Sequence, residues 1–204
     1  MKRAACIVFL SVFLATAGQV AFASAAVAFT SPTIDFSNFT DLVGWQFTVN
    51  NNITVDALGF YDNPANGIHS SHPIGIYDVA TQGLVLSGAV GPADPYSAWF
   101  NWASITPTVL LAGHTYDIVT VLNGDNRTWN PNGITFDSNI TYIQTEYSDG
   151  VHTLAFPCCT DGNPNPGYFG PNFDIGSGTV PEPSTLLLLG TGMLSGLGAL
   201  RRKL

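Results

Sequence analysis

The sequence predicts an all-β domain, an antiparallel jelly-roll-like β-sandwich, and three observations support this prediction. Short runs of alternating or β-branched residues recur at roughly ten-residue spacing along the middle of the chain. No stretch there carries a capped apolar stripe of helical period. Apolar stretches at the two ends leave about 150 residues, enough for one hydrophobic core and too few for two domains. So many short strands around one core are expected to form two sheets packed face to face.

Eleven strands are expected between residues 45 and 175. Turn residues separate them, most clearly in 63–67, 123–126 and 130–133, where asparagine, proline and glycine tolerate positive φ or begin a turn. A parallel β-helix is the alternative architecture, but it would need a fixed-period repeat that this sequence lacks. The expected strands are 45–49, 53–61, 74–79, 84–90, 98–105, 109–111, 115–122, 134–136, 140–147, 151–156 and 168–175.

Charge is distributed unevenly along the chain. All fourteen acidic residues lie between residues 35 and 182, whereas five of the six basic residues lie at the two ends and only Arg127 lies between. One positive and fourteen negative charges give this middle segment a net charge of −13. A surface with that balance cannot collect phosphate groups, so nucleic acid is excluded as a partner.

Residues 1–28 are expected to be a secretory signal peptide that forms an N-terminal helix beside the β domain. Lys2 and Arg3 precede an uncharged apolar run over residues 5–17, which is the order of charged and hydrophobic regions in such a signal. Small-x-small cleavage patterns end at three alanines, so three starting points for the mature chain stay open. General secretion machinery is the expected partner of this segment. The cleavage patterns end at Ala23, Ala26 and Ala28.

Residues 179–204 are expected to form a sorting tail with a transmembrane helix over 186–200. Fifteen helical residues rise about 22 Å, less than the roughly 30 Å hydrocarbon layer, so the span needs its flanking residues and snorkelling basic side chains. The basic cluster after it should stay on the cytoplasmic side and place the large domain outside. The sorting motif and the basic stop are formed by Pro181, Glu182, Pro183, Arg201, Arg202 and Lys203.

This tail resembles the PEP-CTERM sorting tail of Gram-negative bacteria that make exopolysaccharide. Pro-Glu-Pro, a short Leu/Gly-rich helix and a basic cluster follow one another in the same order. The resemblance implies that an exosortase, a membrane-embedded cysteine transpeptidase, recognises the Pro-Glu-Pro and removes the tail. It implies a transient stay in the inner membrane before the cell surface or extracellular polymer. The same tail is also labelled an ice-binding protein C-terminal segment, and that label describes the tail alone.

The middle of the chain, 29–178, resembles an uncharacterised exported β-sandwich domain that is common in bacterial surface proteins. The segments 53–61, 71–78 and 111–118 carry the resemblance. It implies a fold and an exported setting and supplies no catalytic residues. Within the last of these segments, Tyr116 follows a glycine-containing corner at the start of a strand, where its hydroxyl can bond back to the corner backbone.

No catalytic residues are expected, and the protein is predicted not to be an enzyme. The carboxylates are scattered singly along the chain, and the four histidines belong to no recognisable catalytic pattern. A secreted hydrolase is the weaker alternative, which would need two opposed carboxyl groups in a cleft. No metal is expected at the pair spaced His-x-x-His, because its second histidine opens a strand and can satisfy loop backbone groups. The histidines are His69, His72, His114 and His152.

Calcium is the one candidate cofactor. Asn123, Asp125 and Asn126 offer hard oxygen ligands in a polar loop outside the cell, as calcium prefers. Ordinary turn residues are the alternative interpretation of the same cluster, since asparagine and aspartate also favour turns.

Two further features suggest a site. Trp129 in an Asn-rich loop is the first candidate for stacking on a sugar ring, and Trp99 is the second, with core packing as the alternative for both. Cys158 and Cys159 are adjacent and are expected to form a local disulfide in an oxidising compartment, although a link to another chain stays open. The sequence thus favours a non-enzymatic surface or matrix protein associated with exopolysaccharide or biofilm, with a carbohydrate-binding or adhesive module as the alternative.

Overall fold

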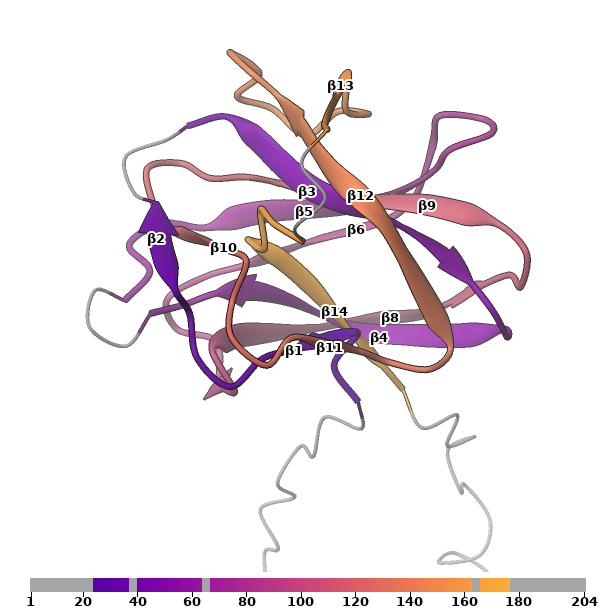
Figure 1. The fold of residues 1–204 in the computed structure, drawn as a ribbon, viewed down its shortest axis with the longest axis horizontal. Helices are drawn as coiled ribbons and strands as arrows, with labels where there is room; N and C mark the ends of the chain where they lie inside the picture. The colour runs from indigo at the N-terminus through magenta and orange to yellow at the C-terminus, as the bar shows by residue number, and fades with distance from the viewer. Residues whose placement is uncertain (1–23, 37–39, 64–66, 163–165, 177–204) are drawn as a thin grey trace, which may run out of the picture.

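A computed structural model describes residues 24–36, 40–63, 67–162 and 166–176, which form β-strands and no helix (Figure 1). Among these residues there is accordingly no helix long and apolar enough to cross a membrane. The strands are β1 (Val27–Ala28), β2 (Ile34–Phe36), β3 (Leu42–Val49), β4 (Ile53–Tyr61), β5 (His72–Asp78), β6 (Gly83–Val90), β7 (Tyr96–Ser97), β8 (Phe100–Leu110), β9 (Thr115–Val121), β10 (Arg127–Trp129), β11 (Thr135–Phe136), β12 (Ile140–Ser148), β13 (Cys159–Asp161) and β14 (Pro171–Ile175).

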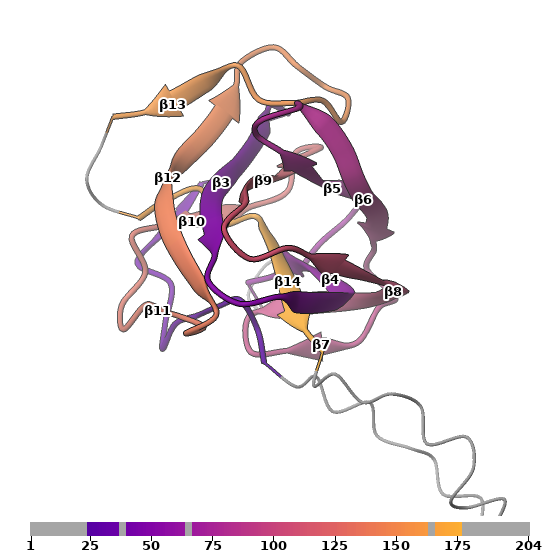
Figure 2. The same cartoon turned by 90° about the vertical axis from the view of Figure 1, so that its right-hand side faces the viewer.

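Two larger sheets lie face to face, and Figure 2 shows them edge on. One has six strands in the order β13-β12-β3-β9-β5-β6, and the other has four in the order β14-β4-β8-β7. The pairs β1-β11 and β10-β2 form two small sheets beside them. Every described strand pair is antiparallel, so the predicted all-β class with antiparallel sheets is confirmed. Jelly-roll connectivity stays a prediction, and the two predicted helices lie in 1–23 and 177–204, outside the described residues.

The core between the sheets follows from the period-two alternation of the strands. In β3, Trp45 and Phe47 are fully buried, and Phe173 from β14 stacks on the Trp45 ring with centroids 5.8 Å apart. Burial of each such side chain contributes about 1.5–3 kcal/mol. Gly44, the residue before Trp45, faces the other way, where a Cβ would overlap the carbonyl oxygen of Ile118 in β9. Only glycine therefore allows β3 and β9 to pair this closely at that point.

A second apolar cluster covers the outer face of the six-stranded sheet. The segment 149–158 lies across it, with Leu154 and Phe156 packed against Tyr77 and neighbouring residues of β3 and β9. The prediction of a strand at 151–156 is therefore wrong. The apolar residues of this segment pack on the outer face of the sheet, and its backbone pairs with none of the described strands. The predicted role of Tyr116 is confirmed, since its hydroxyl accepts a hydrogen bond from the Leu111 N–H at 3.1 Å.

The two strands predicted at 98–105 and 109–111 form one strand, β8, which continues through Pro107. Proline is tolerated there because β8 pairs only with β4 at this point, and the register shift between Val55 and Ala57 absorbs the irregularity. The strands that the sequence did not predict are all two or three residues long, too short for alternation to be visible. They are β1, β2, β7, β10 and β13.

Both ends of the described chain lie at one pole of the sandwich, here called the termini pole and formed by Ser24, Thr54 and Gly176. The Ile175 N–H donates to the Ser24 carbonyl at 2.8 Å, and the Gly176 N–H donates to the Thr54 carbonyl at 2.8 Å. Figure 1 shows both described ends at the lower edge of the molecule. The strand β12 runs upward from there, and its end, with the start of β3 and the end of β9, forms the far pole.

Residues 24–28 belong to the folded domain, although the sequence placed them in the signal peptide. Ala26 and Val27 are fully buried in the core between the sheets. The Ala26 N–H donates to the Phe173 carbonyl at 2.8 Å, and Val27 pairs with Phe136 across β1 and β11. The structured domain therefore begins before the predicted boundary at residue 29.

Candidate functional site

A pocket of about 300 Å³ opens at the far pole. Its walls come from the start of β3, the end of β9, β10, the end of β12 and the segment before β14. Sites on β-sandwiches are commonly built in this way, from loops that a rigid scaffold brings together at one end. The lining residues are Asp41, Val43, Leu122, Arg127, Tyr147, Asp149 and Tyr168.

Arg127 supplies the positive charge of this pocket and is the only Lys or Arg among the described residues. Its guanidinium lies over the ring of Tyr168, 3.7 Å from the ring centroid, a contact that stabilises a cation by about 0.5–2 kcal/mol. Burial lowers the pKa of Arg127, while the nearby Tyr168, Asp161 and Asp41 act in the opposite direction. The guanidinium stays charged, because even a lowered arginine pKa lies far above neutrality.

Tyr168 and Tyr147 give the pocket its aromatic surface. Their rings meet edge to face with centroids 6.2 Å apart. Tyr168 adopts φ +59, a left-handed backbone conformation that non-glycine residues rarely adopt. Burial raises the pKa of the Tyr168 phenol, so at neutral pH the hydroxyl is protonated and can donate a hydrogen bond.

The pocket combines one buried cation, two carboxylates and two phenols. The carboxylates are those of Asp41 and Asp149, and Asp41 also accepts a hydrogen bond from the Gly150 N–H at 2.9 Å. Two carboxylates beside a single guanidinium disfavour an anionic ligand. Charged hydrogen-bonding groups next to aromatic rings suit a neutral polyhydroxylated ligand, whose hydroxyls both donate and accept.

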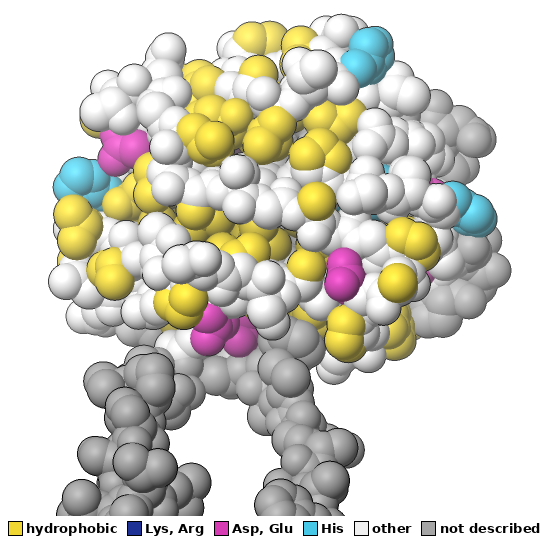
Figure 3. Space-filling view, turned by 180° about the vertical axis from the view of Figure 1, so that it is seen from behind, with side chains coloured by type: hydrophobic (Ala, Val, Ile, Leu, Met, Phe, Trp, Pro, Cys, Tyr) yellow, Lys and Arg dark blue, Asp and Glu magenta, His cyan; other side chains and the backbone are white. Residues whose placement is uncertain are grey.

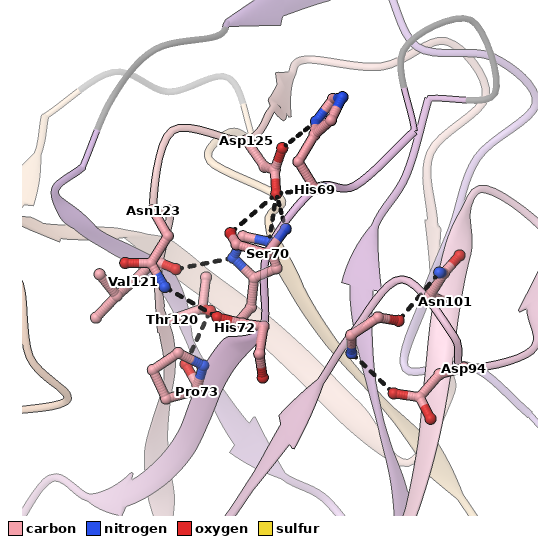
Figure 4. Close-up of polar contacts among 12 residues, drawn as sticks. His69, Ser70, His72, Pro73, Asp94, Asn101, Thr120, Val121, Asn123 and Asp125 are labelled. Carbon is pink, nitrogen blue, oxygen red and sulfur yellow. Dashed lines mark hydrogen bonds and ion pairs between the residues drawn. The ribbon is translucent and has the colours of Figure 1, made fainter.

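A second polar cluster lies beside the pocket and centres on Asp125 (Figure 4). This aspartate follows β9 and is 4 % exposed. It accepts hydrogen bonds from the backbone N–H groups of His69 and Ser70 at 2.8 and 3.1 Å, and from the Ser70 hydroxyl at 3.1 Å. Its two oxygens also lie 2.8 and 2.9 Å from ring nitrogens of His69 and His72. Asp125 therefore ties the loop after β9 to the loop before β5.

His72 is buried and is bound at both ring nitrogens. The ring is fully buried and stacks on Phe60 with centroids 3.5 Å apart. Its Nδ1 lies 3.0 Å from the Val121 carbonyl oxygen and its Nε2 lies 2.9 Å from Asp125 Oδ2. Both ring nitrogens of His72 are therefore held by oxygen atoms, one from the backbone of β9 and one from Asp125. Burial would raise the pKa of Asp125, but the hydrogen bonds from His69, His72 and Ser70 outweigh it and leave the pKa lowered.

Serine, histidine and aspartate meet in this cluster without the arrangement of a nucleophilic triad. A triad needs the serine hydroxyl bonded to the imidazole, with the carboxylate behind the ring. Here the Ser70 hydroxyl bonds to Asp125 and not to His72. The cluster is therefore a clamp between two loops.

The calcium hypothesis does not fit this geometry. The oxygens of Asp125 face N–H and O–H donors, whereas a cation would need their lone pairs. Asn123 donates its amide N–H to the Ser71 carbonyl at 2.9 Å, and Asn126 is buried. Within 24–36, 40–63, 67–162 and 166–176, no group of three or more His, Cys, Asp or Glu residues is arranged to hold a metal ion.

The two tryptophans chosen as sugar-stacking candidates lie elsewhere. Trp129 in β10 packs closely against Gly167, and Trp99 stacks on Phe29 with centroids 6.4 Å apart. Neither lines the pocket, whose aromatic side chains are Tyr147 and Tyr168. No local sequence pattern marked these two tyrosines as parts of one site, because they lie 21 positions apart in the sequence.

Cys158 and Cys159 are joined by a disulfide. It lies at the end of the segment 149–158, where the Cys158 N–H donates to the Ser148 hydroxyl at 2.8 Å and Cys159 pairs with Tyr147 across β13 and β12. The disulfide therefore anchors the chain beside one aromatic wall of the pocket.

Two carboxyl groups are buried on the outer face of the six-stranded sheet. The side-chain amide of Gln46 donates to Asp117 Oδ1 at 2.9 Å and lies 3.4 Å from Glu146 Oε1. Gln144 also donates to Glu146, at 2.8 Å. Burial raises the pKa of Asp117 to about 6 and that of Glu146 to about 7, against the opposing effect of these hydrogen bonds.

Comparison with known proteins shows a sorting motif in the C-terminal segment of the chain. Residues 179–203 match the model of the PEP-CTERM protein-sorting motif, so the predicted sorting tail is confirmed. The motif marks an exported protein that is anchored in the membrane for sorting and processed by an exosortase. No curated protein matches the chain in sequence. The predicted sorting motif and basic stop lie outside the described residues, and they are Pro181, Glu182, Pro183, Arg201, Arg202 and Lys203.

Proposed function

We propose that this is a non-enzymatic surface or matrix protein that reaches the exopolysaccharide or biofilm around the cell through its sorting tail. The observation that carries the proposal is the PEP-CTERM match at residues 179–203, directly after a compact β domain. A tail of this kind serves to deliver the domain that precedes it, so the function lies in what the domain presents at the surface.

The pocket and the last described residue before the tail lie at opposite poles of the sandwich, which supports a role for the pocket at the cell surface. Gly176, the last described residue before the matched tail, lies in the termini pole. The nine-residue strand β12 runs between the poles, a length of about 30 Å at 3.3 Å per residue. The pocket at the far pole therefore lies at the other end of the domain from Gly176, the last described residue before the tail.

The polar groups of the domain support the absence of catalysis. Asp117 and Glu146 are 1 % and 3 % exposed and line no part of the pocket, so a substrate cannot reach them as the opposed acids of a hydrolase. Asp125 and the histidines beside it serve as a clamp.

The tail can be tested by changing Glu182 to alanine. If an exosortase reads Pro-Glu-Pro, this variant accumulates as an uncut form in the membrane fraction, whereas the wild-type protein loses its tail. Immunoblots of fractionated cells and intact-mass measurements distinguish the two. Ser184→Ala is the matched control, because it changes the next polar position and keeps the motif, and it should mature normally. Identical maturation of Glu182→Ala and wild type would contradict the proposal.

Carbohydrate binding is the second candidate function, and the composition of the far-pole pocket favours it. A volume of about 300 Å³ accepts one or two sugar units. The pocket supplies a guanidinium and carboxylates for sugar hydroxyls and the rings of Tyr147 and Tyr168 for an apolar sugar face. The two carboxylates select a neutral sugar over a uronic acid.

Binding of neutral oligosaccharides should depend on Asp149 and not on Trp129. Asp149→Ala removes an exposed hydrogen-bonding group from the pocket rim without disturbing the core, and it should weaken binding about tenfold, the effect of one lost hydrogen bond to a charged group. Trp129→Phe, outside the pocket, should bind like wild type. A glycan array followed by calorimetry measures both. Preference for acidic glycans, or loss of binding in Trp129→Phe alone, would contradict the assignment.

A further inference from the structure

The described chain begins with residues that the fold requires. Ala26 and Val27 have no exposed surface, and the Asn172 side chain bonds to both the N–H and the C=O of Val27, at 3.2 and 2.8 Å. Of the three cleavage patterns in the sequence, those ending at Ala26 and Ala28 would remove one or both of these residues. Only the pattern ending at Ala23 leaves them in the mature protein.

Ser24 is held at the termini pole by two carboxylates. Its backbone N–H donates to Asp174 Oδ1 at 3.0 Å, and its hydroxyl donates to Asp137 Oδ2 at 2.7 Å. Its carbonyl accepts the Ile175 N–H at 2.8 Å. Asp174 is 1 % exposed, so its charge is largely removed from water. The nitrogen of Ser24 thus lies at a buried carboxylate.

Three carboxyl groups gather at this pole. Asp137 and Asp174 contact Ser24, and Asp56 lies against Gly176. Figure 3 shows acidic side chains at the lower edge of the molecule, beside the point where the described chain ends. Arg127, the only Lys or Arg of the described residues, lies at the far pole. A charge-assisted hydrogen bond is roughly twice as strong as a neutral one, so a positive charge on the Ser24 nitrogen would strengthen this contact.

We propose that a signal peptidase hydrolyses the bond between Ala23 and Ser24, and that the new α-ammonium group of Ser24 forms an ion pair with Asp174 at the termini pole. One water molecule is consumed: its oxygen completes the carboxylate of Ala23, and the released nitrogen of Ser24 takes up protons to become the ammonium. Ala21 and Ala23 are the small residues that such an enzyme requires before the cut. Processing of the leader therefore completes the folded domain, independently of what happens at the tail.

The cleavage position is tested by mass spectrometry of the N-terminal peptide of the full chain, expressed with its leader in a secreting Gram-negative host. The expected mature N-terminus is Ser24. Ala23→Leu should block this cut and leave precursor, whereas Ala28→Leu, at an exposed side chain of β1, should still yield Ser24. A wild-type N-terminus at Val27 or Phe29, or precursor accumulation in Ala28→Leu alone, would overturn the proposal.

The ion pair has its own test. The mature protein beginning at Ser24 should melt roughly 3–6 °C above the same protein that retains Ala23 as its first residue, and Asp174→Asn should remove most of this difference. A second measurement needs no substitution: amine-reactive ester should label the Ser24 α-amine of the native protein at least tenfold more slowly than that of the unfolded protein. Equal melting temperatures, or equal labelling rates in the two states, would show that the terminal charge is not held by the fold.

Discussion

Replacing Asp125 with alanine is expected to lower the free energy of unfolding by about 3–5 kcal/mol, because several buried or partly buried donors lose the carboxylate that accepts their hydrogen bonds. The substitution leaves the Nε2 atom of His72 without its hydrogen-bond partner, in a site with no exposed surface and with Phe60 against the ring. It also removes the acceptor of three further donors in the loop 69–70. Urea unfolding of the purified protein at pH 7, followed by tryptophan fluorescence, measures the loss.

His69 and His72 form a matched pair for the same test, because both contact Asp125 at nearly equal distances. The side chain of His69 is 74 % exposed, whereas that of His72 is 0 % exposed. His69→Ala should therefore cost less than about 1 kcal/mol, as exposed ion pairs do. His72→Ala should cost about as much as Asp125→Ala, and the double variant should cost much less than the sum of the two. Equal effects of the two histidine substitutions would show that burial does not determine the strength of this clamp.

The sequence predicted the parts of the fold that depend on local alternation. The bounds of β4 agree with the expected 53–61 because apolar and polar residues alternate and turn residues flank the run. The segment 151–156 shows a similar pattern for another reason, since its apolar residues cover the outer face of the sheet. The strand β1 was missed because Ala-rich sequence suits both a cleavage region and a small buried strand. An alternating pattern of apolar and polar residues shows which side chains are buried. It does not show whether the backbone of the segment pairs with a neighbouring strand.

The candidate sites depended on contacts between distant residues and were less predictable. Asp125 was selected for its oxygens, but its partners lie 53 to 56 residues away in sequence, and they occupy the oxygens that a calcium ion would need. The pocket is assembled from five separate segments, so no local motif describes it. A usable signal was present at Arg127, because a single arginine in an acidic domain is a reasonable marker of a polar site.

The protein should be most stable near pH 5 and lose stability as the pH rises to 8, because of Asp117 and Glu146. The pKa of each carboxyl group is raised, from 3.8 to about 6 and from 4.5 to about 7, with burial as the largest cause. Between the unfolded and folded pKa values the native state therefore holds more protons than the unfolded chain, and the free energy of unfolding falls with increasing pH. Below about pH 4 the lowered pKa values of Asp125 and Asp137 reverse the slope, since those groups lose their native contacts on protonation.

A pKa shift of one unit corresponds to about 1.4 kcal/mol, so the two groups together should reduce the free energy of unfolding by on the order of 3 kcal/mol between pH 5 and pH 8. Asp117→Asn combined with Glu146→Gln keeps the size and polarity of both side chains and removes their titration. This variant should be more stable than wild type at pH 8 and show a much flatter profile. Asp149→Asn, which neutralises an exposed carboxylate, is the control and should retain the wild-type slope. If the double variant fell as steeply as wild type from pH 5 to pH 8, the loss would have to come from groups other than this buried pair.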